Sequence, residues 1–396
     1  MRAVVRSAAL VAGHARDLAV TAETGGGRPG VTWLGFPGAG KQDRQDRVLA
    51  AVAASGLRWP SRQDLTVTAS PAGLPAQPGH DLAVAVAALA AAREIPVTAP
   101  DGIAFFAGLA PDGTLVPVCG VLAAVTAAAN AGSRTVVVAA ANAAEASLND
   151  GVTVIGAGHL ADVTGWLRGG PLPRETDGGE TAGPVRDMGD VECGAAARLA
   201  AEVAAAGGHH LALFGPPDPA REMLAARIPG IMPALSGADL LEVAGLHSLA
   251  GTLTDRTLSG VPPFAAIGGD ALPGDITGRP GPVMRPGTVS LAHRGVLFLR
   301  EAPRLSPEAL ETLRGPVEAG GDAVAHGGIR AWFPASFVMV AGVSPCPCTA
   351  GGAAPGSCTC SHRDRRAYVE RVPGWLASTF TLRVKVTRDA DRKSVV

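Results

Sequence analysis

The chain has 396 residues and a formal net charge of −1, and these two facts already exclude several kinds of protein. The length exceeds one ordinary hydrophobic core, so we expect two domains. A charge so close to zero gives no overall attraction to nucleic acid or to an anionic membrane. The six cysteines are too few for a disulfide scaffold, and no apolar run is long enough to span a bilayer. We therefore expect a cytoplasmic protein without membrane contacts.

The first 168 residues alternate between strand-like and helix-like segments. The runs "VTWLGF", "LTVTA" and "RTVVVAA" predict strands, and the alanine-rich runs "DRVLAAVAASG", "DLAVAVAALAAAREI" and "GVLAAVTAAANAG" predict helices. This alternation predicts an α/β domain over residues 1–168. The stretch that follows is rich in Gly, Pro, Thr and acids, so we interpret residues 169–184 as an interdomain linker.

A second α/β domain is predicted over residues 185–396. A helix should end at Gly207–Gly208, a strand should run through "HHLALFGPP" into a loop, and another helix should begin in "AREMLAARIPG". The apolar runs 294–303 and 335–344 predict two further buried strands. Strands joined by loops and helices in this order are typical of a doubly wound nucleotide-binding sheet.

The stretch "GFPGAGKQ" looks at first like a phosphate-binding loop. Gly35, Gly40 and Lys41 fit the frame G-x-x-x-x-G-K. Gln42, however, stands where such a loop needs a serine or threonine hydroxyl for magnesium. We therefore interpret residues 35–42 as a turn between a strand and a helix.

Four cysteines lie close together in the sequence of the second domain. They form two C-x-C pairs separated by nine residues, and a tetrahedral Zn²⁺ is commonly bound by four thiolates. The Gly/Ala/Pro-rich segment between the pairs leaves two alternatives open, which are free thiols in a loop and a redox disulfide. The cysteines concerned are Cys346, Cys348, Cys358 and Cys360.

The order of motifs resembles the magnesium-chelatase-like AAA+ ATPases of the ComM (YifB) type, over nearly the whole chain. In the first domain the resemblance rests on the segments 30–60, 65–91 and 105–132. In the second it rests on "AAAGGHHLALFGPP", the segment 287–320, "SPCPC…CTCS" and "YVERVPGWLASTFTLRVKV". The resemblance implies a Lon-protease-like domain followed by a P-loop AAA+ αβα sandwich. It also implies ATP-driven hexameric rings that act on branched DNA in recombination and natural transformation.

The resemblance places the nucleotide loop at residues 215–222, where the family pattern is G-P-P-G-T-G-K-T. Gly215, Pro216 and Pro217 match that pattern, and the next five residues, "DPARE", do not. Asp218 brings a negative charge to a loop that binds phosphate through backbone N–H groups, and Pro219 removes one of those donors. Arg221 replaces the lysine with a planar fork, and Glu222 replaces the hydroxyl that binds magnesium.

Other positions that the resemblance assigns to ATP chemistry are also changed. Arg300 stands at the position where the family has its magnesium-binding aspartate, whereas Glu301 matches the family's glutamate that activates water. Ser344 stands at the position of the family's sensor asparagine. Thr379 stands at the position of the arginine finger, and Ser378 and Thr381 stand where the family has the two acidic residues beside that arginine. The sequence ends at Val396 without the helical lid that the resemblance implies. We expect binding of ATP and Mg²⁺ to be weak or lost, with Glu301 a vestige of the catalytic group.

We treat the changes at Glu222 and Arg300 as linked. Glu222 and Arg300 would face each other across the magnesium site, and we expect them to form an ion pair that fills it. The alternative is that both are independent changes at the surface.

Two functions follow from this reading. The first is a pseudo-ATPase that acts as a scaffold or modifier of an ATPase or DNA-processing assembly, with a protein partner or an AAA+-type oligomer. The alternative is an ATP-binding motor of DNA recombination and natural transformation. DNA binding by the arginine-rich stretch 361–372 has little support, because its mixed charges are typical of a solvated helix face. No peptidase activity is expected, because Asp81 and Leu122 occupy the positions that the resemblance gives to the Lon serine and lysine.

Overall fold

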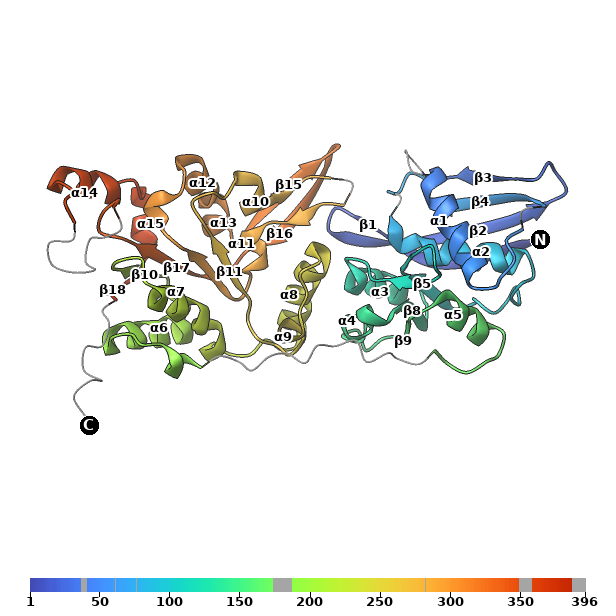
Figure 1. The fold of residues 1–396 in the computed structure, drawn as a ribbon, viewed down its shortest axis with the longest axis horizontal. Coiled ribbons are helices and arrows are strands. Elements are labelled where there is room, and N and C mark those ends of the chain that lie inside the picture. The colour runs from blue at the N-terminus through green and yellow to red at the C-terminus, as the bar shows by residue number, and fades with distance from the viewer. Residues whose placement is uncertain are drawn as a thin grey trace. The chain divides into compact units, whose positions relative to one another are not determined.

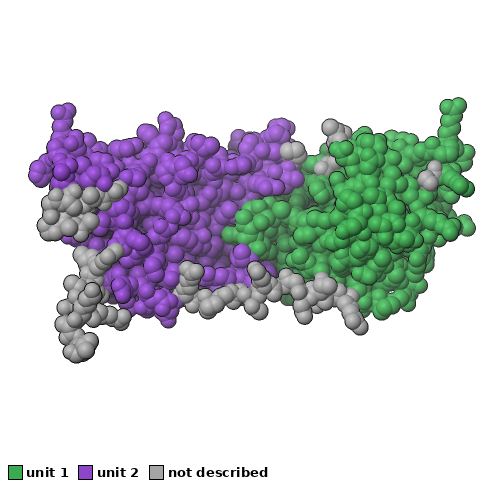
Figure 2. Space-filling model, in the orientation of Figure 1, with its two compact units in different colours: residues 1–181, 247–253 green, residues 182–246, 254–396 purple. Residues whose placement is uncertain are grey.

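The chain folds into two compact units, which Figure 2 colours separately. One consists of residues 1–181 with 247–253, and the other of residues 182–246 with 254–396. The computed structural model describes residues 1–36, 41–60, 62–75, 77–173, 187–281, 283–348 and 358–386. Most of the predicted linker, 169–184, lies outside these ranges. Among the helices in these ranges, none combines the length and the apolar character needed to cross a membrane.

Seven of the described strands of the first unit form a mixed sheet in the order β3-β4-β2-β1-β5-β8-β9 (Figure 1), and β6 (Gly108–Leu109) pairs separately with β7 (Leu115–Val116). The hairpin of β1 and β2 is antiparallel, with Val11 opposite His14 at its turn, and the sequence analysis did not predict it. The first half of β1, residues 2–7, alternates exposed and buried residues, which is the period-2 pattern of a half-buried strand, and residues 8–10 are all buried. The strands are β1 (Arg2–Val11), β2 (His14–Gly25), β3 (Gly30–Leu34), β4 (Asp64–Ser70), β5 (Ile103–Phe106), β8 (Thr135–Ala139) and β9 (Thr153–Ala157).

Helices cover this sheet, and the most buried of them packs against β1 and β2. That helix, α2, is apolar after its first residue and has no solvent-exposed face, because all 11 of its residues are buried. The helices are α1 (Lys41–Ala54), α2 (Asp81–Ala91), α3 (Val121–Asn130), α4 (Ala143–Ala146) and α5 (Leu160–Leu167).

The segment "GFPGAGKQ" joins a strand to a helix, as predicted from Gln42. Strand β3 ends at Leu34 and α1 begins at Lys41, whereas Pro37–Gly40 lie outside the described residues. Gly35 has a φ of +77°, and a Cβ atom there would lie 2.3 Å from the carbonyl oxygen of Ala69. Only glycine fits this position without strain.

Five of the described strands of the second unit form a sheet in the order β11-β14-β17-β10-β18, and every pairing in this sheet is parallel. The buried runs "LALF", "VLFL" and "VMVAGV" supply its three central strands, as continuous apolar runs do in parallel sheets. The strands are β10 (Leu211–Phe214), β11 (Phe264–Ile267), β14 (Val296–Leu299), β17 (Val338–Val343) and β18 (Leu382–Lys385).

Alternate residues of these strands enter two different cores, one on each face of the sheet. Val296 and Phe298 of β14 pack in one core with residues of α6 and α7, and Leu297 and Leu299 pack in the other with residues of α11, α12 and α15. The second unit is therefore a three-layer αβα sandwich, as predicted (Figure 1).

Helices and two small hairpins complete the second unit. Helix α6 ends as predicted, because Gly208 caps it at φ +67°, in the left-handed conformation. The longer helices are α6 (Ala195–Gly207), α7 (Pro219–Arg227) and α14 (His362–Val369). Helix α8 (Gly237–Ala250) begins in this unit, and its residues 247–250 belong to the first unit. The shorter ones are α9 (Asp255–Leu258), α10 (Pro273–Thr277), α11 (Thr288–Leu291), α12 (Pro307–Thr312), α13 (Arg314–Ala319) and α15 (Gly374–Thr379). The longer of the two hairpins pairs β15 (Gly321–His326) with β16 (Ile329–Pro334).

Candidate nucleotide site

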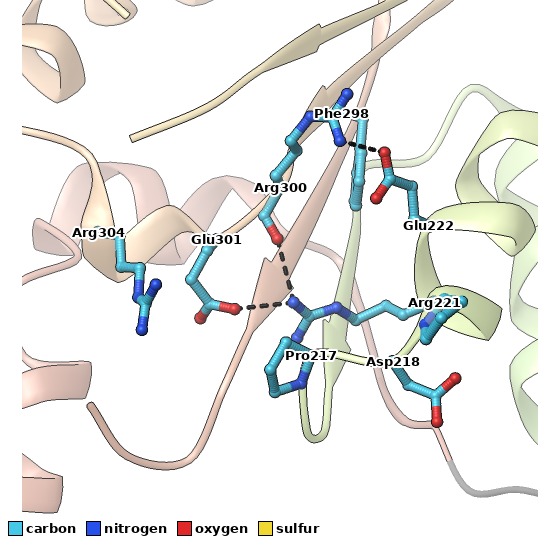
Figure 3. Close-up of a pocket in the computed structure, with 9 residues that line it drawn as sticks. Pro217, Asp218, Arg221, Glu222, Phe298, Arg300, Glu301 and Arg304 are labelled. Carbon is cyan, nitrogen blue, oxygen red and sulfur yellow. Dashed lines mark hydrogen bonds and ion pairs between the residues drawn. The ribbon is translucent and has the colours of Figure 1, made fainter. Parts of the chain in front are cut away.

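The carboxyl ends of β10, β14 and β17 meet at one edge of the parallel sheet, where ligands of doubly wound folds bind. Chain segments that follow these strands bring together the sequence-predicted residues Arg221, Glu222, Arg300, Glu301 and Ser344. A cavity of about 360 Å³ opens there (Figure 3). It is lined by Pro217, Asp218, Pro219, Arg221, Glu222, Phe298, Arg300, Glu301 and Arg304.

The first turn of α7, which would bind phosphate, is satisfied by its own N-cap. The carboxylate of Asp218 accepts a hydrogen bond from the Ala220 N–H at 2.9 Å, and its carbonyl accepts from the Arg221 N–H at 3.0 Å. Pro219, between them, has no N–H to offer. A carboxylate at a helix N-terminus occupies the position that favours an anion. Two backbone donors of this turn, those of Ala220 and Arg221, are thus already bonded within the chain.

Arg221 lines the cavity and is itself buried. Its Nη1 donates to the carbonyl of Gly215 at 3.1 Å, and its Nη2 donates to the carbonyl of Arg300 at 3.1 Å. The same Nη2 lies 2.7 Å from Oε2 of Glu301, and the two side chains are only 5% and 11% exposed. Figure 3 shows the guanidinium directed at that carboxylate.

Glu301 accepts hydrogen bonds from three side chains and one backbone N–H. Besides Arg221, the N–H of Ser344 donates to Oε1 at 2.6 Å and the Ser344 hydroxyl donates to Oε2 at 2.7 Å. The Tyr368 hydroxyl lies 3.3 Å from Oε1. Burial, and then the Glu301 charge, raise the pKa of Tyr368, so this hydroxyl stays protonated and donates. A carboxylate has about four acceptor positions, so Glu301 has none left with which to orient an attacking water.

A glycine in β17 makes room for the buried arginine. A Cβ atom on Gly342 would lie 2.9 Å from the Arg221 guanidinium carbon and 2.4 Å from the Arg300 carbonyl oxygen. Any larger residue there would push the guanidinium away from Glu301.

The predicted ion pair between Glu222 and Arg300 is present, at the mouth of the cavity (Figure 3). The hypothesis expected it to be buried in the former metal site, but the two side chains are 47% and 52% exposed. It is therefore a solvated pair, and the arginine places a positive charge where a divalent cation would bind.

The remaining predicted positions have structural roles. Gly215 is buried, Pro216 is half-buried and Pro217 is exposed on the loop after β10. At the expected finger position, the Thr379 hydroxyl donates to the Trp375 carbonyl at 2.9 Å, and so does that of Ser378 at 2.8 Å. The Thr381 hydroxyl contacts the His210 carbonyl at 3.4 Å.

The sequence analysis missed one role and one residue of the site. It named Asp218 for its charge but not as an N-cap, and the signal for that role was an Asp-Pro pair directly before a helix. Tyr368 reaches Glu301 from α14, 67 residues further along the chain, and nothing in the sequence indicates that contact.

The four clustered cysteines come together in space. Their sulfur atoms all lie within 4.8 Å of one another, so Cys346, Cys348, Cys358 and Cys360 have the arrangement of a metal-ligand set. The segment between the two pairs, 349–357, lies outside the described residues.

The arginine-rich stretch 361–372 contains the whole of α14. Ser361 and Asp364 form a capping box at its start, and Arg366 pairs with Glu370 at 2.7 Å. The one aromatic residue of the stretch, Tyr368, is buried, so it presents no ring on which a base could stack.

In the first unit, the two positions that resemblance gives to the Lon dyad are buried. Asp81 is fully buried at the start of α2 and accepts hydrogen bonds from Arg44 at 2.9 Å and from Arg47 at 2.8 Å. Burial raises the pKa of Asp81, and the two guanidiniums oppose that rise. Next to it, burial and the Arg44 charge lower the pKa of His80 to about 3. Leu122, only 5% exposed, is a core residue of α3.

Comparison with known proteins identifies the family of the chain. A family model described as magnesium chelatase, subunit ChlI, matches residues 187–394, and another, described as subunit ChlI of Mg-chelatase, matches residues 20–142. An uncharacterized protein of Mycobacterium tuberculosis is 42% identical over 373 residues, which are 93% of this chain and 74% of that protein. YifB of Escherichia coli K12, also uncharacterized, is 32% identical over 397 residues, 97% of this chain and 75% of YifB. The competence protein ComM of Haemophilus influenzae Rd is 31% identical over 397 residues, 97% of this chain and 76% of ComM. The chain therefore belongs to the ComM/YifB-type magnesium-chelatase-like family, and its second unit is an AAA+ core.

Proposed function

We propose that this chain is a non-catalytic member of its family, a pseudo-ATPase that acts as a scaffold or modifier of an ATPase or DNA-processing assembly. The observation that carries the proposal is the state of Glu301. Its carboxylate is ion-paired to a buried arginine and accepts three further hydrogen bonds, so it is not available to activate water.

The surrounding charges support the same proposal. A triphosphate entering the cavity would meet the Asp218 carboxylate at the helix N-terminus, and a magnesium ion would meet the Arg300 guanidinium. Each contact repels the ligand that it would have to bind, and like charges about 4 Å apart cost roughly 1–4 kcal/mol between bulk water and a protein surface. The folded cores of both units are intact, and a chain that keeps its fold without its chemistry is suited to binding partners.

Calorimetric titration of ATP into the full chain, with and without Mg²⁺, tests the loss of nucleotide binding. We expect no heat of binding at millimolar ATP. The matched control restores the family pattern with the changes Asp218→Gly, Pro219→Thr, Ala220→Gly, Arg221→Lys, Glu222→Thr and Arg300→Asp. We expect this control to bind ATP in a Mg²⁺-dependent manner. Micromolar binding by the unaltered chain that strengthens with Mg²⁺ would instead support the motor in DNA recombination.

The scaffold role needs a separate measurement. One relative is named a competence protein, so natural transformation is the process in which we propose to seek the partner. The chain should co-elute with an ATP-hydrolysing member of the family in size-exclusion chromatography and should change its steady-state ATPase rate. Separate elution with an unchanged rate would contradict a role as its modifier.

A further inference from the structure

We propose that Cys346, Cys348, Cys358 and Cys360 bind one Zn²⁺ as thiolates, and that this zinc centre holds α14 in the position where Tyr368 contacts Glu301. The inference does not depend on the loss of ATPase activity, because it concerns a site next to the cavity rather than the cavity itself.

The sulfur positions favour a single metal ion. Sγ of Cys346 lies 3.0 Å from Sγ of Cys348 and 3.4 Å from Sγ of Cys358, and the last two are 3.4 Å apart. Four thiolates bound to Zn²⁺ at about 2.3 Å would be separated by about 3.8 Å, close to these values. A four-iron cluster would instead distribute its cysteines over four different irons and hold them further apart.

The same distances argue against the disulfide alternative. A disulfide brings two sulfurs to about 2.05 Å and leaves any other sulfur outside bonding distance. Here three sulfurs are mutually close and the fourth, of Cys360, lies within 4.8 Å of each of them. No disulfide joins any of the cysteines among the described residues. Free thiols in a loop would have no reason to converge in this way.

The surroundings suit a centre with negative charge. Four thiolates and one Zn²⁺ carry a formal charge of −2, which neighbouring cations and hydrogen-bond donors stabilise. The Arg365 guanidinium donates to the Cys358 carbonyl at 3.5 Å, and its Nε is buried without an acceptor among the described residues. On the other side, Arg304 donates to the Pro347 carbonyl at 3.3 Å. Cys346 is buried and Cys348 is exposed, so the centre lies at the surface, where a chelator can reach it.

The position of the ligands in the chain explains the proposed link to Glu301. Cys346 follows Ser344 by two residues, and Ser344 donates two hydrogen bonds to Glu301. Cys360 is followed directly by Ser361, the N-cap of α14, and that helix carries Tyr368 to the same carboxylate. A metal ion bound by both cysteine pairs would therefore tie together the two segments that supply these donors.

Metal analysis of the purified full chain tests the site. We expect one zinc per chain by mass spectrometry of the metals, its loss in the variant Cys358→Ser/Cys360→Ser, and its retention in the matched control Cys119→Ala. Replacement of zinc by Co²⁺ should give the absorption bands of a tetrahedral thiolate complex. A metal-free chain with cysteines joined in disulfides would overturn the proposal.

The chain contains a single tyrosine, which makes the link to α14 measurable. Protein labelled with 3-fluorotyrosine should give one ¹⁹F resonance, in the position of a buried ring. Chelation of zinc from the unaltered chain should move this resonance to the position of an exposed tyrosine, and added Zn²⁺ should restore it. This readout needs no variant to fold. A resonance that stays in place after the zinc is removed would show that the metal does not position α14.

Discussion

The buried pair of Arg221 and Glu301 makes a quantitative prediction, which a double-mutant cycle tests. The changes are Arg221→Met, Glu301→Gln and their combination. Methionine keeps much of the arginine's apolar length, and glutamine keeps the shape of the carboxylate. Each single change therefore removes one charge and leaves the other buried.

The exposed fractions of the two side chains, 5% and 11%, set the magnitude. Breaking a buried ion pair costs about 3–5 kcal/mol, because one charge is left without its partner. Glu301 keeps the donors of Ser344 and Tyr368, so we expect the Arg221→Met variant to lose about 3 kcal/mol of unfolding free energy, the low end of that range. Glu301→Gln should cost about 2–3 kcal/mol, because Arg221 keeps two carbonyl acceptors. The double variant should lose about 3–4 kcal/mol, which gives a coupling energy of about 2 kcal/mol.

Equilibrium unfolding in urea, followed by tryptophan fluorescence, measures these free energies. The chain has two units, so the probe must report on the second alone. A background with Trp33, Trp59 and Trp166 changed to phenylalanine leaves the two tryptophans of the second unit, and the half-buried Trp375 packs against its core. Single effects that add, with a coupling energy below about 0.5 kcal/mol, would refute the reasoning. The two side chains would then not share a buried contact.

Three further predictions follow from other residues. His80 is neutral in the folded chain, whereas in the unfolded chain it takes up a proton below about pH 6.5. The free energy of unfolding should therefore decrease as the pH falls from 6.5 towards 3, by about 2 kcal/mol at pH 5. The variant His80→Gln, whose amide can still donate to the Ala8 carbonyl, should lose that part of the acid sensitivity in unfolding titrations at pH 8 and pH 5. For the exposed pair at the cavity mouth, Glu222→Gln should change the unfolding free energy by less than about 1 kcal/mol, and a loss as large as that of the buried pair would contradict the solvated geometry. Gly35→Ala should destabilise the first unit by at least about 2 kcal/mol, more than the control Gly56→Ala, whose φ of +70° is similar but whose Cβ would meet nothing within 4 Å. Equal decreases in melting temperature in those two variants would show that the backbone at Ala69 moves to accommodate the added Cβ atom.

The parts of the fold with a local signal could be predicted from the sequence. The runs at 211–214, 296–299 and 338–343 are apolar at every position, and such runs flanked by turn residues indicate buried parallel strands. Gly208 likewise marked the end of a helix. The hairpin of β1 and β2 was not predicted, because small residues such as Ala and Ser give the alternation little contrast in hydrophobicity.

The sequence identified most residues of the site but only one of the contacts between them. The altered loop and Arg300 are visible in the sequence, and the pairing of Arg300 with Glu222 was expected from the positions that the family resemblance gives to the magnesium site. The stronger pairing, of Arg221 with Glu301, was not predicted, because it depends on the space that Gly342 leaves in a neighbouring strand. Contacts between segments that are distant in the sequence depend on how the segments pack, and this packing produces no recognisable residue pattern in the sequence of either segment.

Helix α2 has a consequence for how this protein tolerates sequence change. A helix at a surface accepts substitutions on one side, so a map of tolerated mutations along it rises and falls with a period of about 3.6 residues. In α2 all 11 residues are buried, so such a map should be flat and uniformly low. Small side chains let its neighbours approach closely, and larger ones would overpack the core by about 1–3 kcal/mol each. The helix can therefore diverge only together with the strands that surround it.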